Sequence, residues 1–139
     1  AMANLLETAE NTGSFKTFLS ALEQAGLTSE LENPGSFTVL APTDEAFAKL
    51  PEGALDELLA DPLKLKKVLS YHILFGDVRS DDLAQIDEAP TVEGSVISVE
   101  QNNGITVNDT PVTQMDILSD NGVIHAIDGV LMPAIVAGG

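Results

Sequence analysis

Apolar residues in the first half of the chain recur at the spacing of amphipathic helices. The recurrence predicts helices around residues 5–9, 15–22, 55–59 and 65–72. Ser14 can cap the second of these helices, and Gly26 can take the left-handed conformation that often ends one. Asp61 precedes a proline, which is the usual order of a cap and a first helical residue.

A different pattern follows in residues 37–41, FTVLA, which are apolar or β-branched without polar alternation. Such a run is typical of a strand covered on both faces. Pro42 ends the strand because it has no backbone N–H to donate. Thr43 or Asp44 can cap the helix that comes next, and Phe47 lies on the face of that helix that folds back over the core.

The second half of the chain contains short apolar runs separated by turn residues. Asn103-Gly104 is a tight-turn signal, and Asn121-Gly122 opens the last long run. The runs predict strands over residues 96–101, 105–108, 112–118, 123–127 and 130–132. Helices first and antiparallel strands afterwards, with one early strand, predict an α+β fold in which short helices pack against a mostly antiparallel sheet.

Length and composition restrict the possible functions. The 139 residues predict one domain over 4–136, with tails at 1–3 and 137–139. A net charge of −16 argues against nucleic acid and anionic lipid as partners. The chain has no cysteine, which excludes disulfides and thiolate catalysis. No apolar run is long enough for a membrane span, so we expect no membrane insertion.

Three segments occur in an order that resembles the fasciclin-like domain family. They are GSFTVLAPTDEAFAKLP at 35–51, Tyr71-His72, and NGVIHAIDGVLMP at 121–133. The resemblance extends over about residues 4–133 and implies a wedge-shaped β core with a layer of helices. It also implies no catalytic residues and no obligatory cofactor. The family's structural-motif positions correspond to Thr38, Pro42, Thr43, Phe47, Gly122, His125 and Asp128.

The resemblance also indicates candidate adhesion residues. In animal members of the family, an Asp-Ile pair and the Tyr-His region have been implicated in integrin binding. The matching residues are Asp116, Ile117, Tyr71 and His72. We favour a structural interpretation of the Asp-Ile pair, because buried apolar residues outnumber binding hot spots in any domain. Ile117 would be buried, and Asp116 would cap a turn or accept backbone hydrogen bonds. The acidic, cysteine-free single domain resembles a microbial secreted member more than an animal matrix protein.

The titratable residues do not form a recognisable catalytic or metal site. His72 falls on an apolar stripe and His125 lies inside a strand, so we expect both rings to be buried, neutral and hydrogen-bonded. Their separation lacks the spacing of a helical zinc site, and no EF-hand loop is present, although weak surface calcium binding stays open. No Gly-x-Ser-x-Gly elbow or phosphate-binding loop occurs. Asn108 begins a glycosylation tripeptide, which we interpret first as a turn.

Two functions remain. We expect a non-enzymatic adhesion module that binds a protein or glycan on a cell surface or matrix, without a cofactor or metal. The alternative is a secreted carrier or sensor that holds a small apolar ligand between helices and sheet. We expect a monomer located extracellularly, at the cell surface or in the periplasm, with a signal peptide already removed.

Overall fold

The computed structural model describes residues 4–32, 36–101 and 103–133. Its helices are α1 (Leu5–Thr12), α2 (Lys16–Ala25), α3 (Thr28–Glu32), α4 (Asp44–Ala48), α5 (Ala54–Leu59), α6 (Pro62–Ser70) and α7 (Ser80–Leu83). Its strands are β1 (Phe37–Pro42), β2 (Ile73–Phe75), β3 (Glu88–Pro90), β4 (Val96–Gln101), β5 (Ile105–Val107), β6 (Thr110–Ser119) and β7 (Gly122–Ile127). These elements confirm the predicted α+β class.

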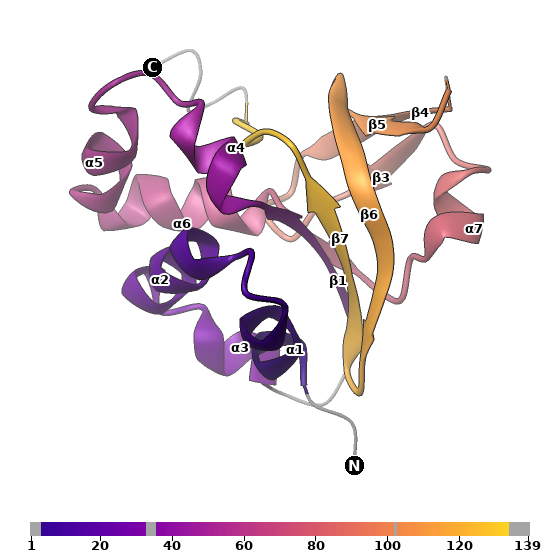
Figure 1. Ribbon diagram of the computed structural model, residues 1–139, viewed down its shortest axis with the longest axis horizontal. Helices are drawn as coiled ribbons and strands as arrows, with labels where there is room; N and C mark the ends of the chain where they lie inside the picture. The colour runs from indigo at the N-terminus through magenta and orange to yellow at the C-terminus, as the bar shows by residue number, and fades with distance from the viewer. Residues whose placement is uncertain (1–3, 33–35, 102, 134–139) are drawn as a thin grey trace.

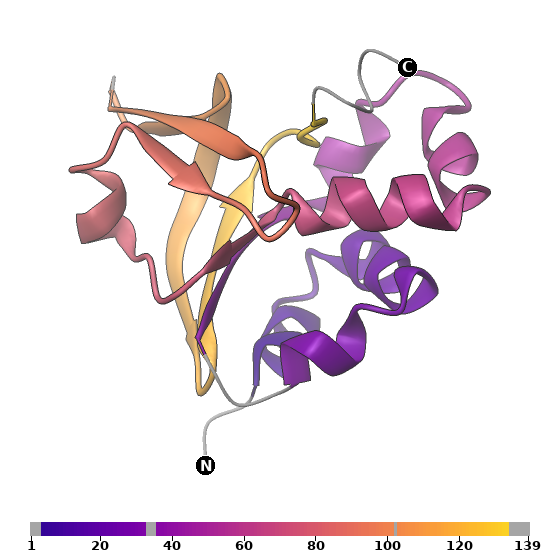
Figure 2. The same cartoon turned by 180° about the vertical axis from the view of Figure 1, so that it is seen from behind.

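The strands form one sheet in the order β2-β1-β7-β6-β5-β4-β3. β1 and β7 are parallel, and the other neighbours are antiparallel. A bridge between Leu74 and Thr91 joins β2 to the region after β3, so the sheet curls back on itself. The result is the expected wedge, in which β3, β4 and β5 fold over the far side of the long strands (Figure 1 and Figure 2).

The early and late apolar strands, β1 and β7, pair with each other at the centre of the sheet. Val39 of β1 pairs with Ile124 of β7, and both strands are buried along almost their whole length. Alternate side chains point to opposite faces. Val39 and Ile124 enter the core under the helices, which we call the helix-side core. Leu40 and Ile127 enter a second core enclosed by the curled sheet, which we call the strand-side core.

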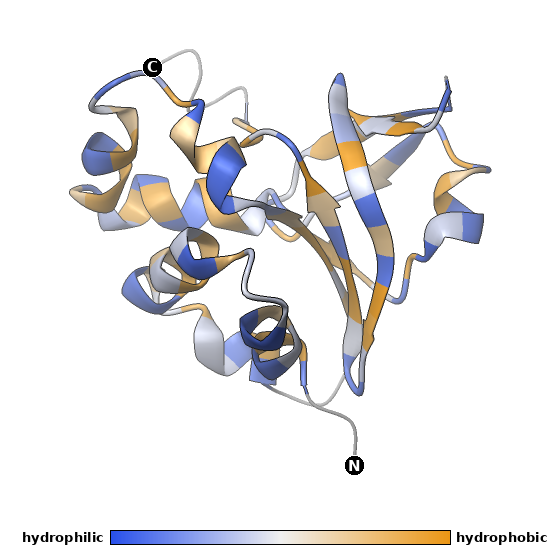
Figure 3. Cartoon of the chain, viewed as in Figure 1, coloured by the Kyte–Doolittle hydropathy of each residue, from blue (hydrophilic) through white to orange (hydrophobic). Residues whose placement is uncertain are grey.

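The helices are divided between the two sides of the sheet. Helices α1 to α6 cover one face, whereas α7 lies on the opposite side (Figure 1). In Figure 3 the ribbon of β6 alternates between hydrophobic and hydrophilic residues, as expected for a strand with one face towards solvent. The helical layer therefore comes mainly from the N-terminal half of the chain, as predicted.

Most helix ends follow the sequence signals. Gly26 has φ 74° and adopts the left-handed conformation directly after α2. The side chains of Thr43 and Asp61 accept hydrogen bonds from the first turns of α4 and α6. The prediction for Ser14 was wrong, because α2 begins at Lys16 and its N-terminal turn is capped from a distance: the Asp44 carboxylate accepts a hydrogen bond of 2.8 Å from the Thr17 N–H.

Three local predictions differ from the structure. Residues 130–132 do not form a strand, because the Leu131 N–H donates to the His72 ring and not to a strand partner. β3 was missed, since three residues with a proline carry almost no strand signal. His72 lies two residues past the end of α6 and not on the helix. The predicted tails and residues 134–136 of the domain lie outside the described residues.

The turn between β6 and β7 fastens the helices to the sheet. The Asn121 side chain accepts a 2.9 Å hydrogen bond from the Leu5 N–H and donates one of 2.6 Å to the Leu31 carbonyl. Next to it, the Phe37 N–H donates to the Asn121 carbonyl, which brings β1 close to Gly122. A Cβ atom on Gly122 would lie 2.0 Å from the Phe37 carbonyl oxygen. Only glycine therefore allows this approach.

Gly122→Ala is expected to lower the free energy of unfolding by about 3 kcal/mol or more, because the methyl group would push β1 away from β7. Urea denaturation measures the change. Gly13→Ala is the matched control: Gly13 has φ 76° but nothing within 4 Å of an added Cβ, so it should cost only about 1 kcal/mol of backbone strain. Equal losses in the two variants would contradict the steric argument.

Candidate functional site

A bulge in β6 determines where Asp116 points. Gln114 pairs with Ala126 and Ile117 with Ile124, so two residues of β6 lie opposite His125 alone. Asp116 has φ 60°, a left-handed conformation that aspartate tolerates better than most residues. The bulge turns the Asp116 N–H inwards and leaves the carboxylate exposed at the surface.

His125 fills the space behind this bulge. Its ring is fully buried, and Nε2 lies 2.7 Å from the Val78 carbonyl, which can only accept a hydrogen bond. Nε2 therefore carries the proton, and Nδ1 accepts a bond of 3.2 Å from the Asp116 N–H. Burial lowers the pKa of His125, against the opposing effects of the Val78 carbonyl and the Asp116 carboxylate. The predicted burial and hydrogen bonding of His125 are confirmed.

The Asp116 carboxylate binds the start of α7. One oxygen accepts a 2.9 Å hydrogen bond from the Ser80 N–H, and the other accepts a bond from the Ser80 hydroxyl. The hydroxyl bond is the main cause of a lowered Asp116 pKa, and burial opposes it. The structural interpretation of Asp116 as an acceptor of backbone hydrogen bonds is therefore present in the structure, with a partner 36 residues away.

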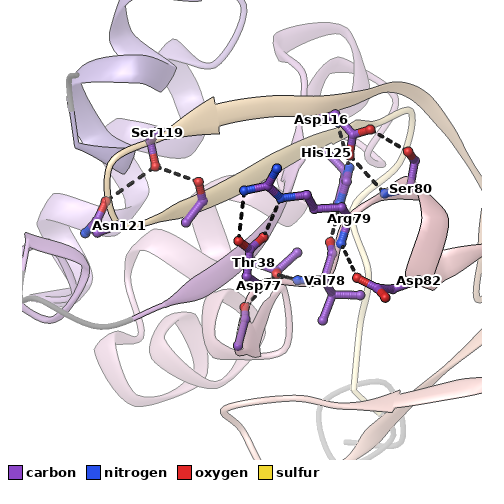
Figure 4. Close-up of polar contacts among 12 residues, drawn as sticks. Thr38, Asp77, Val78, Arg79, Ser80, Asp82, Asp116, Ser119, Asn121 and His125 are labelled. Carbon is purple, nitrogen blue, oxygen red and sulfur yellow. Dashed lines mark hydrogen bonds and ion pairs between the residues drawn. The ribbon is translucent and has the colours of Figure 1, made fainter.

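Thr38 completes a set of contacts that holds residues 76–80, which we call the 76–80 clamp. Its hydroxyl donates to the Gly76 carbonyl and accepts from the Val78 N–H, both at 2.8 Å. Figure 4 shows Thr38, His125 and Asp116 reaching the same segment from β1, β7 and β6. Three strands thus fix the backbone of one loop through side chains.

Exposed groups surround the clamp on the face away from the helices. Arg79 forms two hydrogen bonds of 3.1 Å with the Asp77 carboxylate beside it. Leu118, two residues beyond Asp116, has 41% of its surface exposed. Sequence reasoning missed both Leu118 and Ser80. Leu118 directly follows Ile117 in the strand, so the alternation of faces predicts that Leu118 is exposed if Ile117 is buried. No local signal connects Ser80 with Asp116.

Ile117 points the other way. It is half-buried and packs against the helix-side core, as the structural interpretation expected. Neighbouring residues of a strand face opposite sides, so the two residues of the Asp-Ile pair do not share one surface. A partner that approaches this face meets the Asp116 carboxylate and Leu118, and Ile117 only in part.

Tyr71 lies inside the molecule with 5% of its surface exposed. Its hydroxyl donates to the Val96 carbonyl at 3.2 Å and accepts from Asn108 Nδ2 at 2.8 Å. Asn108 also accepts a bond from the Ser98 N–H, so both ends of its amide are used inside the fold. Asn108 and Asp109 form the turn between β5 and β6, as interpreted from the sequence.

His72 is fully buried on the helix side of the sheet. Its Nδ1 donates to the Val68 carbonyl at 2.7 Å, so Nε2 is unprotonated and accepts from the Leu131 N–H at 2.9 Å. The Phe18 ring meets it edge-on with centroids 6.2 Å apart. Burial lowers the pKa of His72 to about 4. Neither Tyr71 nor His72 can touch a partner directly, so an adhesive effect of this pair would act through the fold.

The remaining motif residues have structural surroundings. Pro42 is the last residue of β1, opposite Ile127, and Thr43 caps α4. Phe47 is buried in the helix-side core. Asp128 forms an ion pair of 2.7 Å with Lys49 at the surface.

No group of three or more metal-ligating side chains occurs in the part of the chain that the structure describes. All four ring nitrogens of the two histidines are engaged with backbone groups. None of the described helices is both long and apolar enough to cross a membrane.

Comparison with known proteins identifies relatives over nearly the whole chain. The family model described as Fasciclin domain matches residues 13–133. The uncharacterized protein sll1735 of Synechocystis is 40% identical over 94% of this chain and 98% of its own length. Human periostin is 39% identical over 83% of this chain but only 14% of its own length.

A solved structure supports the same relationship. The FAS1 domain pair from the insect cell adhesion molecule Fasciclin I superposes with a TM-score of 0.71 and 25% identity, over 87% of this chain and 46% of that one. The porcine transforming growth factor-beta-induced protein ig-h3 is 34% identical over 95% of this chain and 20% of its own length. The chain therefore corresponds to one part of these longer animal proteins.

The low pKa of His72 predicts a pH dependence of stability. The folded state keeps the ring neutral down to about pH 4, whereas the unfolded state takes up a proton near the ordinary pKa of 6.5. Acid therefore favours unfolding, and the contribution of His72, complete above about pH 6.5, is lost as the pH falls towards 4. Between pH 7 and about pH 4.5 the loss should be about 2 kcal/mol.

His72→Gln separates this effect from the titration of the many carboxylates. At pH 7 the variant should unfold about 2 kcal/mol more easily, because the single flexible amide does not hold both the Val68 carbonyl and the Leu131 N–H as the two ring nitrogens do. Near pH 4.5 the difference between variant and wild type should almost disappear. Urea denaturation at both pH values measures it, and a difference that stays constant with pH would contradict the assignment.

Proposed function

This chain belongs to the fasciclin domain family, and from this membership we propose that it is a non-enzymatic adhesion module that acts outside the cell. Its partner is a protein or glycan on a cell surface or in a matrix. Fasciclin domains occur in an insect cell adhesion molecule, which supports a role of this kind. The location is the cell surface, the extracellular space or the periplasm.

The observation that carries the proposal is the fixed position of Asp116 beside the exposed Leu118. Ser80 holds the Asp116 carboxylate, and His125 accepts a hydrogen bond from the Asp116 backbone N–H. A side chain held this way loses little conformational entropy on binding. Each carboxylate oxygen has acceptor capacity beyond its bond to Ser80. An exposed apolar residue beside a charged group is a reasonable centre for a small contact surface.

The carrier function receives less support. The apolar cavity between α1, α2 and the sheet has a free volume of about 10 Å³, which is hardly enough for one water molecule. Pockets that enclose small molecules are far larger. The described part of the core is therefore better suited to supporting a surface than to holding a ligand.

The chemistry of the histidines supports the proposal that the module is non-enzymatic. Burial lowers the pKa of both rings, and each ring is tied to the backbone on both sides. A general base must reach a substrate proton with a free nitrogen. We therefore propose structural roles for His72 and His125, with no cofactor and no resident metal, in a monomeric module.

An attachment assay tests the adhesion proposal. Cells lacking the protein would be compared with cells complemented by wild type, by Asp116→Ala or by Leu118→Ser. We expect deletion to abolish the attachment due to this protein. Each variant should weaken it by about fivefold or more, which is the effect of truncating one of the few residues at the centre of an interface.

Glu100→Ala is the matched control, because it removes one exposed carboxylate from β4, away from the clamp. It should attach like wild type. Thermal denaturation of each purified variant shows whether it is folded. Unchanged attachment after deletion would refute adhesion, whereas loss in the Glu100→Ala control would show that overall charge, and not Asp116, is responsible.

A further inference from the structure

Three N-terminal helices form a groove on the side of the molecule away from the 76–80 clamp. Helices α1, α2 and α3 lie side by side in both Figure 1 and Figure 2. The groove between them has a volume of about 610 Å³ and is open to solvent. Asn121 fastens α1 and α3 to the β6–β7 turn, so two of the walls are tied to the sheet.

The floor of the groove is apolar and the rim is acidic. Leu6 and Leu19 are half-buried in the floor, and both also line the small cavity of about 10 Å³ beneath it. The rim carries the exposed carboxylates of Glu7, Glu10, Glu23 and Glu32, which come from all three helices. Lys16 is the single cation among the lining residues.

The carboxylates stand apart from one another. No cluster of metal-ligating side chains occurs among residues 4–32, 36–101 and 103–133, so the four glutamates do not converge on one point. None of them forms an ion pair within those ranges. A divalent cation needs several oxygens around one centre, which this arrangement lacks. Several cations spread along a chain would fit it better.

The open shape of the groove also restricts what can bind in it. Sites for small molecules bury most of the ligand surface, whereas an open groove leaves much of it in water. A polypeptide segment can lie along such a groove and place one apolar side chain against the floor. The net charge of −16 attracts cationic partners and repels a second copy of this acidic chain.

We propose that the groove between α1, α2 and α3 binds a lysine- or arginine-rich segment of a partner protein. An apolar side chain of the segment contacts Leu6 and Leu19, and its cations face the glutamates on the rim. This site is separate from the Asp116 surface, so the inference goes beyond the proposed adhesion role and does not depend on it.

A fluorescent peptide of lysine, alanine and leucine, with leucines along one helical face, tests the proposal by anisotropy titration. Glu7→Gln/Glu10→Gln/Glu23→Gln should weaken its binding about tenfold, because three exposed charge pairs are lost. Glu52→Gln/Glu88→Gln/Glu100→Gln changes the net charge equally at exposed positions outside the groove, and should leave binding unchanged. Replacing the leucines of the peptide by alanine should also weaken binding about tenfold.

Two outcomes would overturn the proposal. Equal weakening in the two triple variants would show attraction by net charge alone. The other concerns this chain's own α6, where Leu63 is 76% exposed beside Lys64, Lys66 and Lys67. If a peptide of residues 61–70 bound more tightly than the designed peptide, and the protein dimerised with rising concentration in sedimentation experiments, the occupant would be a second copy and not a different protein.

Discussion

The parallel pairing of β1 with β7 is the constraint on which the rest of the fold depends. Two segments far apart in the chain form the centre of the sheet, and both are buried on both faces. The pairing closes only because Gly122 lets the Phe37 carbonyl approach its backbone. Each face then needs its own cover: six helices provide one, and the curled strands provide the other.

A strand buried on both faces cannot leave polar groups unsatisfied, and this requirement explains the two histidines and Thr38. Thr38 and His125 face the strand side and hold the 76–80 loop. His72 faces the helix side and holds the segment after β7 through the Leu131 N–H. Each side chain replaces a backbone partner that irregular structure does not supply. These three motif residues therefore link separate segments inside the fold through hydrogen bonds.

These internal contacts leave the binding features of the molecule at its surface. The cavity between α1, α2 and the sheet has a free volume of only about 10 Å³, and both nitrogens of each histidine ring are hydrogen-bonded to the backbone. The exposed features lie on opposite sides of the sheet: Asp116 and Leu118 beside the clamp, and the acidic groove on the helices. An adhesion module benefits from this separation, because two surfaces on a stiff core can engage different partners without competing for space.

Periodicity was enough to predict most of this architecture. The helical spacing of residues 15–22, the unbroken apolar run of residues 37–41 and the Asn-Gly turns are local signals, and the structure confirms the elements they predict. The burial of His72 and His125 followed from their apolar neighbours. Short elements such as β3 were missed because three residues carry too little pattern.

The candidate site was beyond such reasoning. The Asp-Ile pair could be located in the chain, but the bulge opposite His125 and the contact of the Asp116 carboxylate with Ser80 could not. Ser80 and Asp44 meet their partners over separations of 36 and 27 residues. Local sequence determines propensity and periodicity, whereas contacts between distant segments exist only after the strands have paired, and these contacts decide which side chains are held at the surface.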